Sequence, residues 1–248
     1  MKIVEATWEK RNFGMDVFEI TLNKKDLKNF EETLEIIKKQ NFKNVYVVLK
    51  MPVGNLKALH KLEDLGYRFL ETQISLIDNF EPKLDKYDGI EDNIIKNIAI
   101  ENIPKEKEQW ERIIKKITPG MFDLDRVSLD PLLGKEIACK RYKNWCMDLF
   151  DNPNSSMIVR KIGNKECGFA INVVDKMNGK IDGIIGGVFE EFKNIGLGIS
   201  WLHEKNGYDS KQNPIQTSVS SNNVSVLKIH QQAGRIVTRL KYVLRKVY

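Results

Sequence analysis

The chain of 248 residues is 42% hydrophobic and 30% charged, which is the composition of an ordinary folded protein and excludes a disordered one. No window approaches the roughly 18 apolar residues of a membrane span, and residues 1–14 lack a signal-peptide core, so a cytoplasmic protein without a membrane partner is expected. The net charge is +6, and no acidic residue follows Asp209. This uneven bias would attract a polyanionic partner, either nucleic acid or a phosphate-rich cofactor, although for any single basic residue a solvated strand or helix face is the favoured alternative.

The three cysteines, Cys139, Cys146 and Cys167, are consistent with a reducing compartment. Cys139 and Cys146 lie on one predicted helix, where a rise of about 1.5 Å per residue separates their Cα atoms by roughly 10 Å. That distance is too long for a disulfide. No metal-ligand spacing is present, so no metal is expected.

Strands and helices alternate along the sequence. Residues 24–40 place Leu27, Phe30 and Leu34 on one helical stripe, and the apolar run 44–50 is typical of a buried strand. The other predicted helices are 55–66, 105–117, 135–150, one that begins after Gly198, and 223–232. The other predicted strands are 67–78, 93–103, 157–163, 166–174, 180–189, 214–220, 235–240 and 242–247.

Residues 79–92 are rich in charged and turn-forming residues and make the best linker in the chain. This linker predicts two units of mixed helices and strands. The first is a small α/β unit over residues 1–85, and the second is a larger domain over residues 90–248.

The stretch from Gly186 to Ser200, GGVFEEFKNIGLGIS, leads a strand into a turn with two close glycines and then into a helix. Glycine permits a tight helix entry, and it also lets a phosphate approach the unpaired N–H groups of a helix start. A Walker loop would need Gly-Lys-Ser/Thr at this turn, and a dinucleotide fingerprint would need a glycine in place of Trp201. Both are excluded.

The order of strand, Lys193, glycine turn and helix resembles the pyrophosphate loop of the GCN5-related N-acetyltransferase (GNAT) superfamily, whose pattern is Gln/Arg-x-x-Gly-x-Gly/Ala. That superfamily also carries an asparagine, a tyrosine at plus seven and a glycine at plus eleven. Asn223, His230 and Gly234 have this spacing, although His230 replaces the tyrosine and Arg235 replaces a phenylalanine. The resemblance covers residues 93–248 and implies an α/β (α+β) GNAT fold, in which helices flank a mixed, mostly antiparallel sheet.

Segments 8–17, 123–146 and 222–246 are similar to the dTDP-fucosamine N-acetyltransferases, which acetylate the 4-amino group of a nucleotide-linked deoxysugar. In that group a small amino-terminal α/β unit precedes the acetyltransferase domain. The resemblance implies acetyl-CoA as the cofactor and a small primary amine, on a sugar nucleotide, as the acceptor. It does not identify the sugar, because acceptor pockets are built from variable loops.

The resemblance also implies a cofactor site. Backbone N–H groups at the glycine turn, with Lys193, would hold the pyrophosphate, and free N–H groups at Val188 and Phe189 would hold the pantetheine arm and the acetyl carbonyl. The predicted cofactor-binding residues are Val188, Phe189, Lys193, Asn194, Ile195, Gly196, Leu197, Gly198, Ile199 and Asn223.

His230 is the predicted proton donor to the departing CoA thiolate, and Tyr242 is the next candidate. Nearby cations such as Arg235 should lower the pKa of His230 and leave little of its acid form at neutral pH. For the proton of the amine, Asp182, Glu190 and a chain of waters are the alternatives.

The acceptor is predicted to contact Asp123, Arg126 and Tyr142. Arg126 would meet a nucleotide phosphate, and a surface salt bridge is the equal alternative. Tyr142 has a core position as its alternative.

The two predicted units echo each other, because Asn55 and Gly66 repeat the eleven-residue step of Asn223 and Gly234. Residues 1–85 are therefore interpreted as a degenerate half of the same fold, with ordinary helix capping as the alternative. No glycine lies between Met15 and Val53, so this unit is not expected to bind the cofactor.

Two functions remain open. The favoured one is an N-acetyltransferase in which a small amine attacks acetyl-CoA directly. The alternative is a non-catalytic protein that senses CoA or holds nucleic acid, in which the missing tyrosine marks lost activity. Nucleic acid is the less expected partner, and the sequence leaves a homodimer open.

Overall fold

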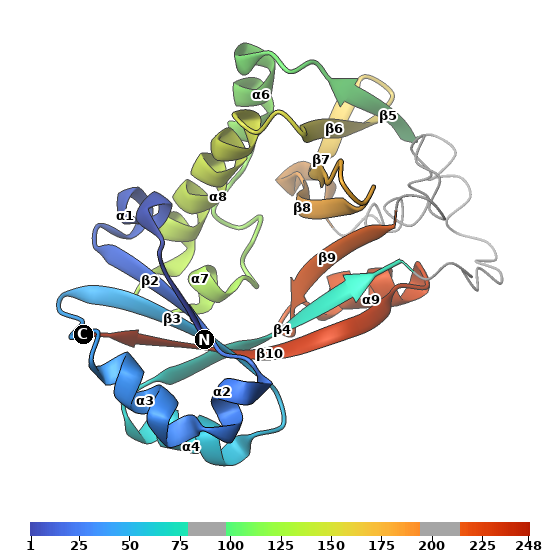
Figure 1. Ribbon diagram of the computed structural model, residues 1–248. Coiled ribbons are helices and arrows are strands. Elements are labelled where there is room, and N and C mark those ends of the chain that lie inside the picture. The colour runs from blue at the N-terminus through green and yellow to red at the C-terminus, as the bar shows by residue number, and fades with distance from the viewer. Residues whose placement is uncertain (79–97, 194–213) are drawn as a thin grey trace.

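The computed structural model describes residues 1–78, 98–193 and 214–248. These residues form a ten-stranded sheet in the order β1-β2-β3-β10-β4-β9-β8-β7-β6-β5, with helices on both faces (Figure 1). Neighbouring strands are antiparallel except for β2 with β3 and β8 with β9. The sequence prediction of a mixed, mostly antiparallel sheet flanked by helices is confirmed.

The elements of this part of the chain have the following bounds. The strands are β1 (Lys2–Glu5), β2 (Asp16–Thr21), β3 (Val45–Pro52), β4 (Arg68–Ile77), β5 (Ile98–Ile103), β6 (Ser155–Ile162), β7 (Lys165–Val174), β8 (Ile181–Val188), β9 (Ile215–Ser220) and β10 (Ile236–Val247). The helices are α1 (Thr7–Phe13), α2 (Lys24–Lys28), α3 (Phe30–Lys38), α4 (Leu56–Asp64), α6 (Lys107–Ile114), α7 (Arg126–Leu129), α8 (Gly134–Phe150), α9 (Val224–Gln232) and the short 3₁₀ helix η1 (Glu190–Phe192).

Several predicted boundaries need correction. The segment 24–40 is two helices, because Asn29 leaves helical geometry at φ −108° and ψ 48° between them. Residues 235–247 contain one long strand, not two. Residues 1–21, for which no element was predicted, contain β1, α1 and β2. The predicted helix after Gly198 lies outside the described residues.

Two large apolar clusters hold the sheet to its helices. One joins α6 and α8 to β6, β7 and β8, with Trp110 and Phe169 fully buried at its centre. The other joins α3 and α4 to β2, β3 and β10 around Leu49 and Leu62. Figure 1 shows α3 and α4 on one side of β3 and β10, and α1, α7 and α8 on the other. The three cysteines are buried and free, and Cys139 and Cys146 are not joined by a disulfide. No helix in the described ranges is long and apolar enough to cross a membrane.

β4 and β10 are exchanged between the two halves of the chain. β10, from the second half, lies between β3 and β4, and β4, from the first half, lies between β10 and β9. Gln73 of β4 pairs with Lys241 of β10 at the centre of this strand pair. Gln73 and Lys241 are separated in sequence by the same number of residues as Asn55 and Asn223. The neighbouring pairs come in matching sets, in which each residue of one pair corresponds to a residue of the other at this same sequence separation. The pair Thr72–Tyr242 matches Ile74–Leu240, and Glu71–Val243 matches Ser75–Arg239.

The helices next to the exchanged strands have matching ends. The Asn55 side chain accepts the Ala58 amide at 3.0 Å at the start of α4, and the Asn223 side chain accepts the Val226 amide at 3.2 Å at the start of α9. Both helices are followed by a glycine with positive φ, 89° at Gly66 and 74° at Gly234. Only glycine adopts this conformation without strain, which explains the shared spacing.

Candidate functional site

The parallel strands β8 and β9 separate soon after they meet. Ile181 and Asp182 pair with Ile215 and Gln216, and the Thr217 hydroxyl then donates to the Gly183 carbonyl at 2.8 Å. No further pair joins these two strands, whereas β9 stays paired with β4 as far as Ser220. The edge of β8 from Ile184 to Val188 therefore faces a gap in the sheet.

Backbone amides on this edge can bind an extended ligand. The Phe189 amide donates to the Cys167 carbonyl at 2.9 Å, so it is held by β7 and is not the free group that the sequence analysis expected. Alternate amides of a strand point to opposite sides, so the amides of Gly186 and Val188 point into the gap. Of the two predicted backbone positions, Val188 is the one with its amide on the open side.

The equivalent strands of the first unit do not separate. β2 pairs in parallel with β3 along its whole length, from Asp16 with Val45 to Thr21 with Lys50. A closed pair leaves no edge amide for a pantetheine arm, which gives a second reason, besides the absence of glycine, why this unit should not hold the cofactor.

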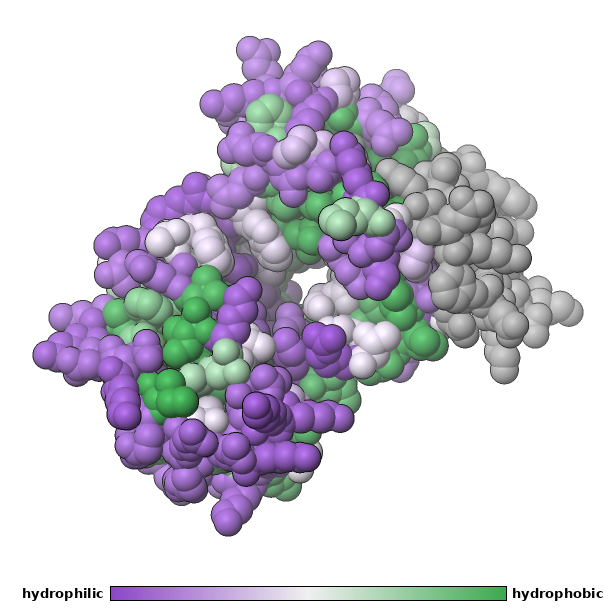
Figure 2. Space-filling view, in the orientation of Figure 1, coloured by the Kyte–Doolittle hydropathy of each residue, from purple (hydrophilic) through white to green (hydrophobic). Residues whose placement is uncertain are grey.

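The gap opens onto the side of the sheet that carries α7. Figure 2 shows an opening through the middle of the molecule, between the part built on β6, β7 and β8 and the part built on β4, β9 and β10. Figure 1 places α7, β8 and β9 around this opening. The candidate site is therefore formed by both halves of the chain.

Lys193 follows η1, and its ammonium is already occupied. It donates to the Gly120 carbonyl at 2.6 Å and forms an ion pair with Glu190 at 3.1 Å. Binding of a pyrophosphate by this side chain would require release of both contacts. The other predicted pyrophosphate contacts, Asn194, Ile195, Gly196, Leu197, Gly198 and Ile199, lie outside the described residues.

His230 lies on α9 and is buried among polar neighbours. Its Nδ1 is 2.6 Å from an Arg235 guanidinium nitrogen, and Arg235 forms an ion pair with Asp78 at 2.7 Å. Burial and, to a smaller extent, the charge of Arg235 together lower the pKa of His230 to about 3. Since guanidinium only donates, Nδ1 is the acceptor and the proton lies on Nε2. His230 is therefore neutral at pH 7, and the predicted role of its imidazolium form as proton donor is not supported.

The lowered pKa predicts a stability effect that can be measured. Above about pH 6.5 both the folded and the unfolded chain hold this histidine neutral, so it has no effect. As the pH falls from 6.5 towards 3, the unfolded chain binds a proton that the folded chain does not, and stability is lost. We expect His230→Gln to flatten the fall of Tm between pH 7 and pH 4. His60→Gln, at an exposed site on α4, is the control, and equal slopes in the parent and His230→Gln would contradict the prediction.

Tyr242 does not lie at the opening. Its ring packs edge-on against Phe69, 6.0 Å between centroids, and joins the core between the sheet and α4. Its neighbour Val243 faces the opposite side, towards Tyr46 and Val48. The suggestion that Tyr242 could replace His230 as proton donor is therefore not supported by its position.

Arg126, the first residue of α7, lies inside a polar cluster under this helix. Its guanidinium is 3.7 Å from Glu19, which also binds Lys50 at 3.1 Å. Burial alone would lower the pKa of Arg126, but the carboxylates Glu71, Glu19 and Asp125 raise it. Three carboxylates thus surround the cation that was predicted to meet a nucleotide phosphate, and this setting disfavours an added anion.

The two other predicted acceptor residues have different positions. Asp123 is half-buried in the loop before α7. Tyr142 is buried in the core on α8, with its ring stacked 3.9 Å from that of Phe122, as the core alternative expected. Contact of either residue with an acceptor stays a prediction.

Glu71, on the exchanged strand β4, was not singled out from the sequence. It is 95% buried, at 5% exposure, and its Oε2 has no hydrogen-bond partner among the described residues. Burial raises the pKa of Glu71, and Arg126 only partly offsets this. Alternation along a strand places Glu71, Gln73 and Ser75 on one face, but sequence alone could not show that this face meets α7.

The two carboxylates proposed from the sequence as bases are both engaged. Asp182 accepts a hydrogen bond from Gln216 at 2.5 Å at the point where β8 and β9 part. Glu190 binds Lys193 and Thr118, and these contacts lower its pKa. A lowered pKa makes a carboxylate a weaker base, so Glu190 is the poorer candidate.

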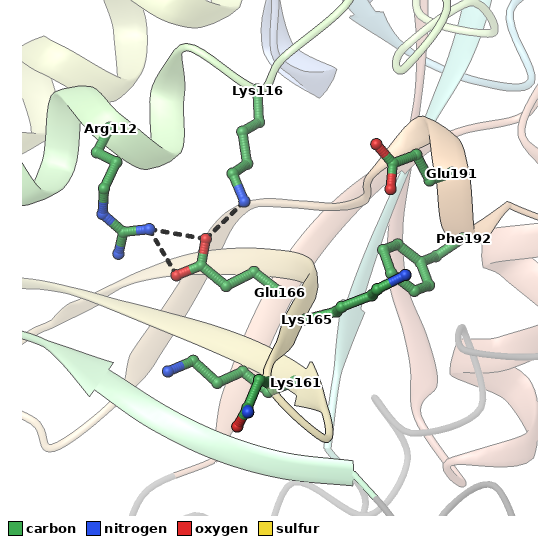
Figure 3. Close-up of a pocket in the computed structure, with 8 residues that line it drawn as sticks. Arg112, Lys116, Lys161, Lys165, Glu166, Glu191 and Phe192 are labelled. Atoms are coloured by element: carbon green, nitrogen blue, oxygen red, sulfur yellow. Dashed lines mark hydrogen bonds and ion pairs between the residues drawn. The ribbon is translucent and has the colours of Figure 1, made fainter.

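A separate surface pocket of about 410 Å³ lies beside α6 and the β6–β7 turn (Figure 3). Arg112 and Lys116 both bind Glu166 there, and Lys161 forms an ion pair with Glu101. These carboxylates offset only part of the positive charge that Arg112, Lys116, Lys161 and Lys165 bring to the pocket. Within the described ranges no group of three or more His, Cys, Asp and Glu residues is arranged to hold a metal ion.

No protein-family model and no curated protein matches the chain. A solved GCN5-related N-acetyltransferase from Sphaerobacter thermophilus superposes with a TM-score of 0.60 at 14% identity, over 99% of this chain and 76% of that one. A conserved protein of unknown function from Staphylococcus epidermidis superposes with a TM-score of 0.57 at 13% identity, over 94% and 84%.

A tandem GNAT protein from the clavulanic acid biosynthesis pathway is also similar, with a TM-score of 0.53 at 7% identity, over 93% of this chain and 75% of that one. At such identities a superposition shows the fold. The chain therefore has the GNAT fold, as the glycine turn and the Asn223 spacing predicted. None of these three structures supports the narrower resemblance to dTDP-fucosamine N-acetyltransferases.

Proposed function

We propose that the chain is an acetyl-CoA-dependent N-acetyltransferase that acts on a primary amine of a small acceptor. The observation that carries this proposal is the separation of β8 and β9 at Gly183. A gap beside one strand of a sheet can receive an extended arm such as pantetheine, and the Gly186 and Val188 amides on its edge can donate to the arm and to the acetyl carbonyl.

The reaction needs little from the protein. The amine nitrogen attacks the thioester carbonyl, the C–S bond breaks, and the CoA thiolate leaves. Neutral His230 would donate a hydrogen bond from Nε2 to the cofactor and would not act as an acid. With Asp182 and Glu190 both engaged, a chain of waters in the opening is the proposed route for the amine proton.

The acceptor that we propose is an amino sugar linked to a nucleotide, which follows from the resemblance over segments 8–17, 123–146 and 222–246. A non-catalytic CoA sensor is the second candidate. The observation that favours it is the burial of His230 against the Arg235 guanidinium, which lowers the pKa of the histidine and removes the expected acid.

Release of CoA from acetyl-CoA, measured with a panel of amines, tests the proposal. The panel contains a dTDP-linked 4-amino sugar, UDP-glucosamine, glucosamine, spermidine and a peptide with a free amino terminus. We expect turnover with at least one amine and the fastest rate with a nucleotide-linked sugar. Tight binding of acetyl-CoA without turnover on any amine would establish the sensor.

A further inference from the structure

The floor of the opening carries two cations side by side. Arg239 and Lys241 alternate on β10 with Tyr242, and they share the face of Val243, which packs towards Tyr46 and Val48. Both therefore point to the α7 side of the sheet, onto which the gap beside β8 opens. Arg239 is exposed and Lys241 is half-buried.

Neither cation has an ion-pair partner among the residues that the structure describes. Glu19 is the carboxylate that acts on Lys241 at longer range, and it is bound to Lys50 and faces Arg126. Burial lowers the pKa of Lys241, and repulsion from Arg239 lowers it further. Two like charges on one strand face therefore lack the anion that would stabilise them.

Neutral hydrogen-bonding groups surround the two cations on the same face. Gln73 pairs with Lys241 across the sheet, and Ser75 pairs with Arg239. The Ser75 and Ser218 hydroxyls are 3.3 Å apart, and Ser218 is exposed. Their strand neighbours Leu76 and Val219 point the other way and are buried. The floor is thus polar and open.

We propose that this floor, formed by Gln73, Ser75, Ser218, Arg239 and Lys241, binds a phosphate-bearing polyhydroxyl group. Two adjacent cations suit a diphosphate, and hydroxyl and amide groups beside them suit sugar hydroxyls. The inference rests on the proposed function, since it makes this group the nucleotide part of the acceptor. It also assigns the phosphate contact to β10 in place of Arg126.

Phosphate in the opening has two sources, the acceptor and CoA itself, and a titration with two arms separates them. In the first arm the chain is saturated with CoA and titrated with UDP or with inorganic pyrophosphate. In the second arm the free chain is titrated with acetyl-CoA. We expect Lys241→Gln and Arg239→Gln each to weaken UDP binding about tenfold or more, because each removes a charge-assisted contact. Acetyl-CoA affinity should stay within twofold.

Lys228→Gln, on the exposed side of α9, is the matched control for net charge and should leave both affinities unchanged. If the CoA-saturated chain binds neither UDP nor pyrophosphate, the inference is wrong. It is also wrong if the β10 variants weaken acetyl-CoA and UDP alike, since the cations would then serve the cofactor. These outcomes are independent of CoA release, so failure of the proposed function would be seen separately.

Discussion

Residues 86–248, expressed without residues 1–85, are expected not to fold. β10 pairs with β3 and β4 alone, and both strands come from the first 85 residues. Without them β10 has no neighbour in the sheet, its backbone N–H and C=O groups lose their partners, and Leu244 loses the core on which it packs. The fragment lacks the neighbouring strand on both sides of β10, so we expect it to be insoluble or unfolded.

Coexpression of residues 1–85 with residues 86–248 is the control, because it restores both strands without restoring the chain connection. We expect the two fragments to copurify and to melt cooperatively, as measured by circular dichroism. A monomeric fragment 86–248 that is soluble, melts cooperatively and binds acetyl-CoA on its own would show that the strand exchange is dispensable.

Glu9→Gln is expected to lower the free energy of unfolding by about 3–5 kcal/mol, the range for breaking a buried ion pair. Glu9 of α1 accepts a hydrogen bond from Arg141 of α8 at 2.7 Å, and both residues are at least 90% buried. The neutral variant leaves the buried Arg141 without its ion-pair partner. The pair joins α1 of the first unit to α8 of the second.

Arg11→Gln is the matched control, because Arg11 and Asp148 join the same two helices at the surface. Exposed pairs contribute about 1 kcal/mol or less, so this variant should be nearly as stable as the parent. Urea unfolding of Glu9→Gln, Arg141→Gln and the double variant measures the coupling. Equal losses for Glu9→Gln and Arg11→Gln would mean that burial of the first pair adds nothing.

The predicted elements were most accurate where local pattern decides structure. The apolar run at 44–50 and the helix at 55–66 with its asparagine and glycine ends are present, because helix capping and burial of an apolar strand are encoded within a few residues. The first 21 residues were missed, because β1, α1 and β2 are each short and their apolar residues contact distant helices.

The exchange of β4 and β10 could not be predicted from local pattern. Both segments read as strands, but their partners are set by contacts between residues far apart in the chain, such as Gln73 with Lys241. The repeat of Asn55 and Gly66 at Asn223 and Gly234 indicated two related units. It did not indicate that each unit supplies a strand to the other.

Only part of the candidate site could be predicted, again because some of its contacts join residues that are far apart in the chain. The strand that ends at Val188 lies on the gap, as the family pattern implied, and Asn223 caps α9 as a local signal can predict. The environments of Arg126 and His230 depend on residues from other elements, which include Glu19, Glu71 and Asp78. Those contacts change the charge of the site: they place carboxylates around Arg126, and Arg235 helps to lower the pKa of His230, as the sequence analysis expected.

Calorimetric titration of the full chain with acetyl-CoA tests the central claim most directly. The open pair β8–β9 and the closed pair β2–β3 predict one binding site per chain. The bound cofactor should raise the stability of the fold by about 2.7 kcal/mol at 100 times its dissociation constant. A stoichiometry of one with such stabilisation is the result that we expect. An absence of binding would contradict the assignment of the gap, and two sites per chain would contradict the restriction of cofactor binding to the second half.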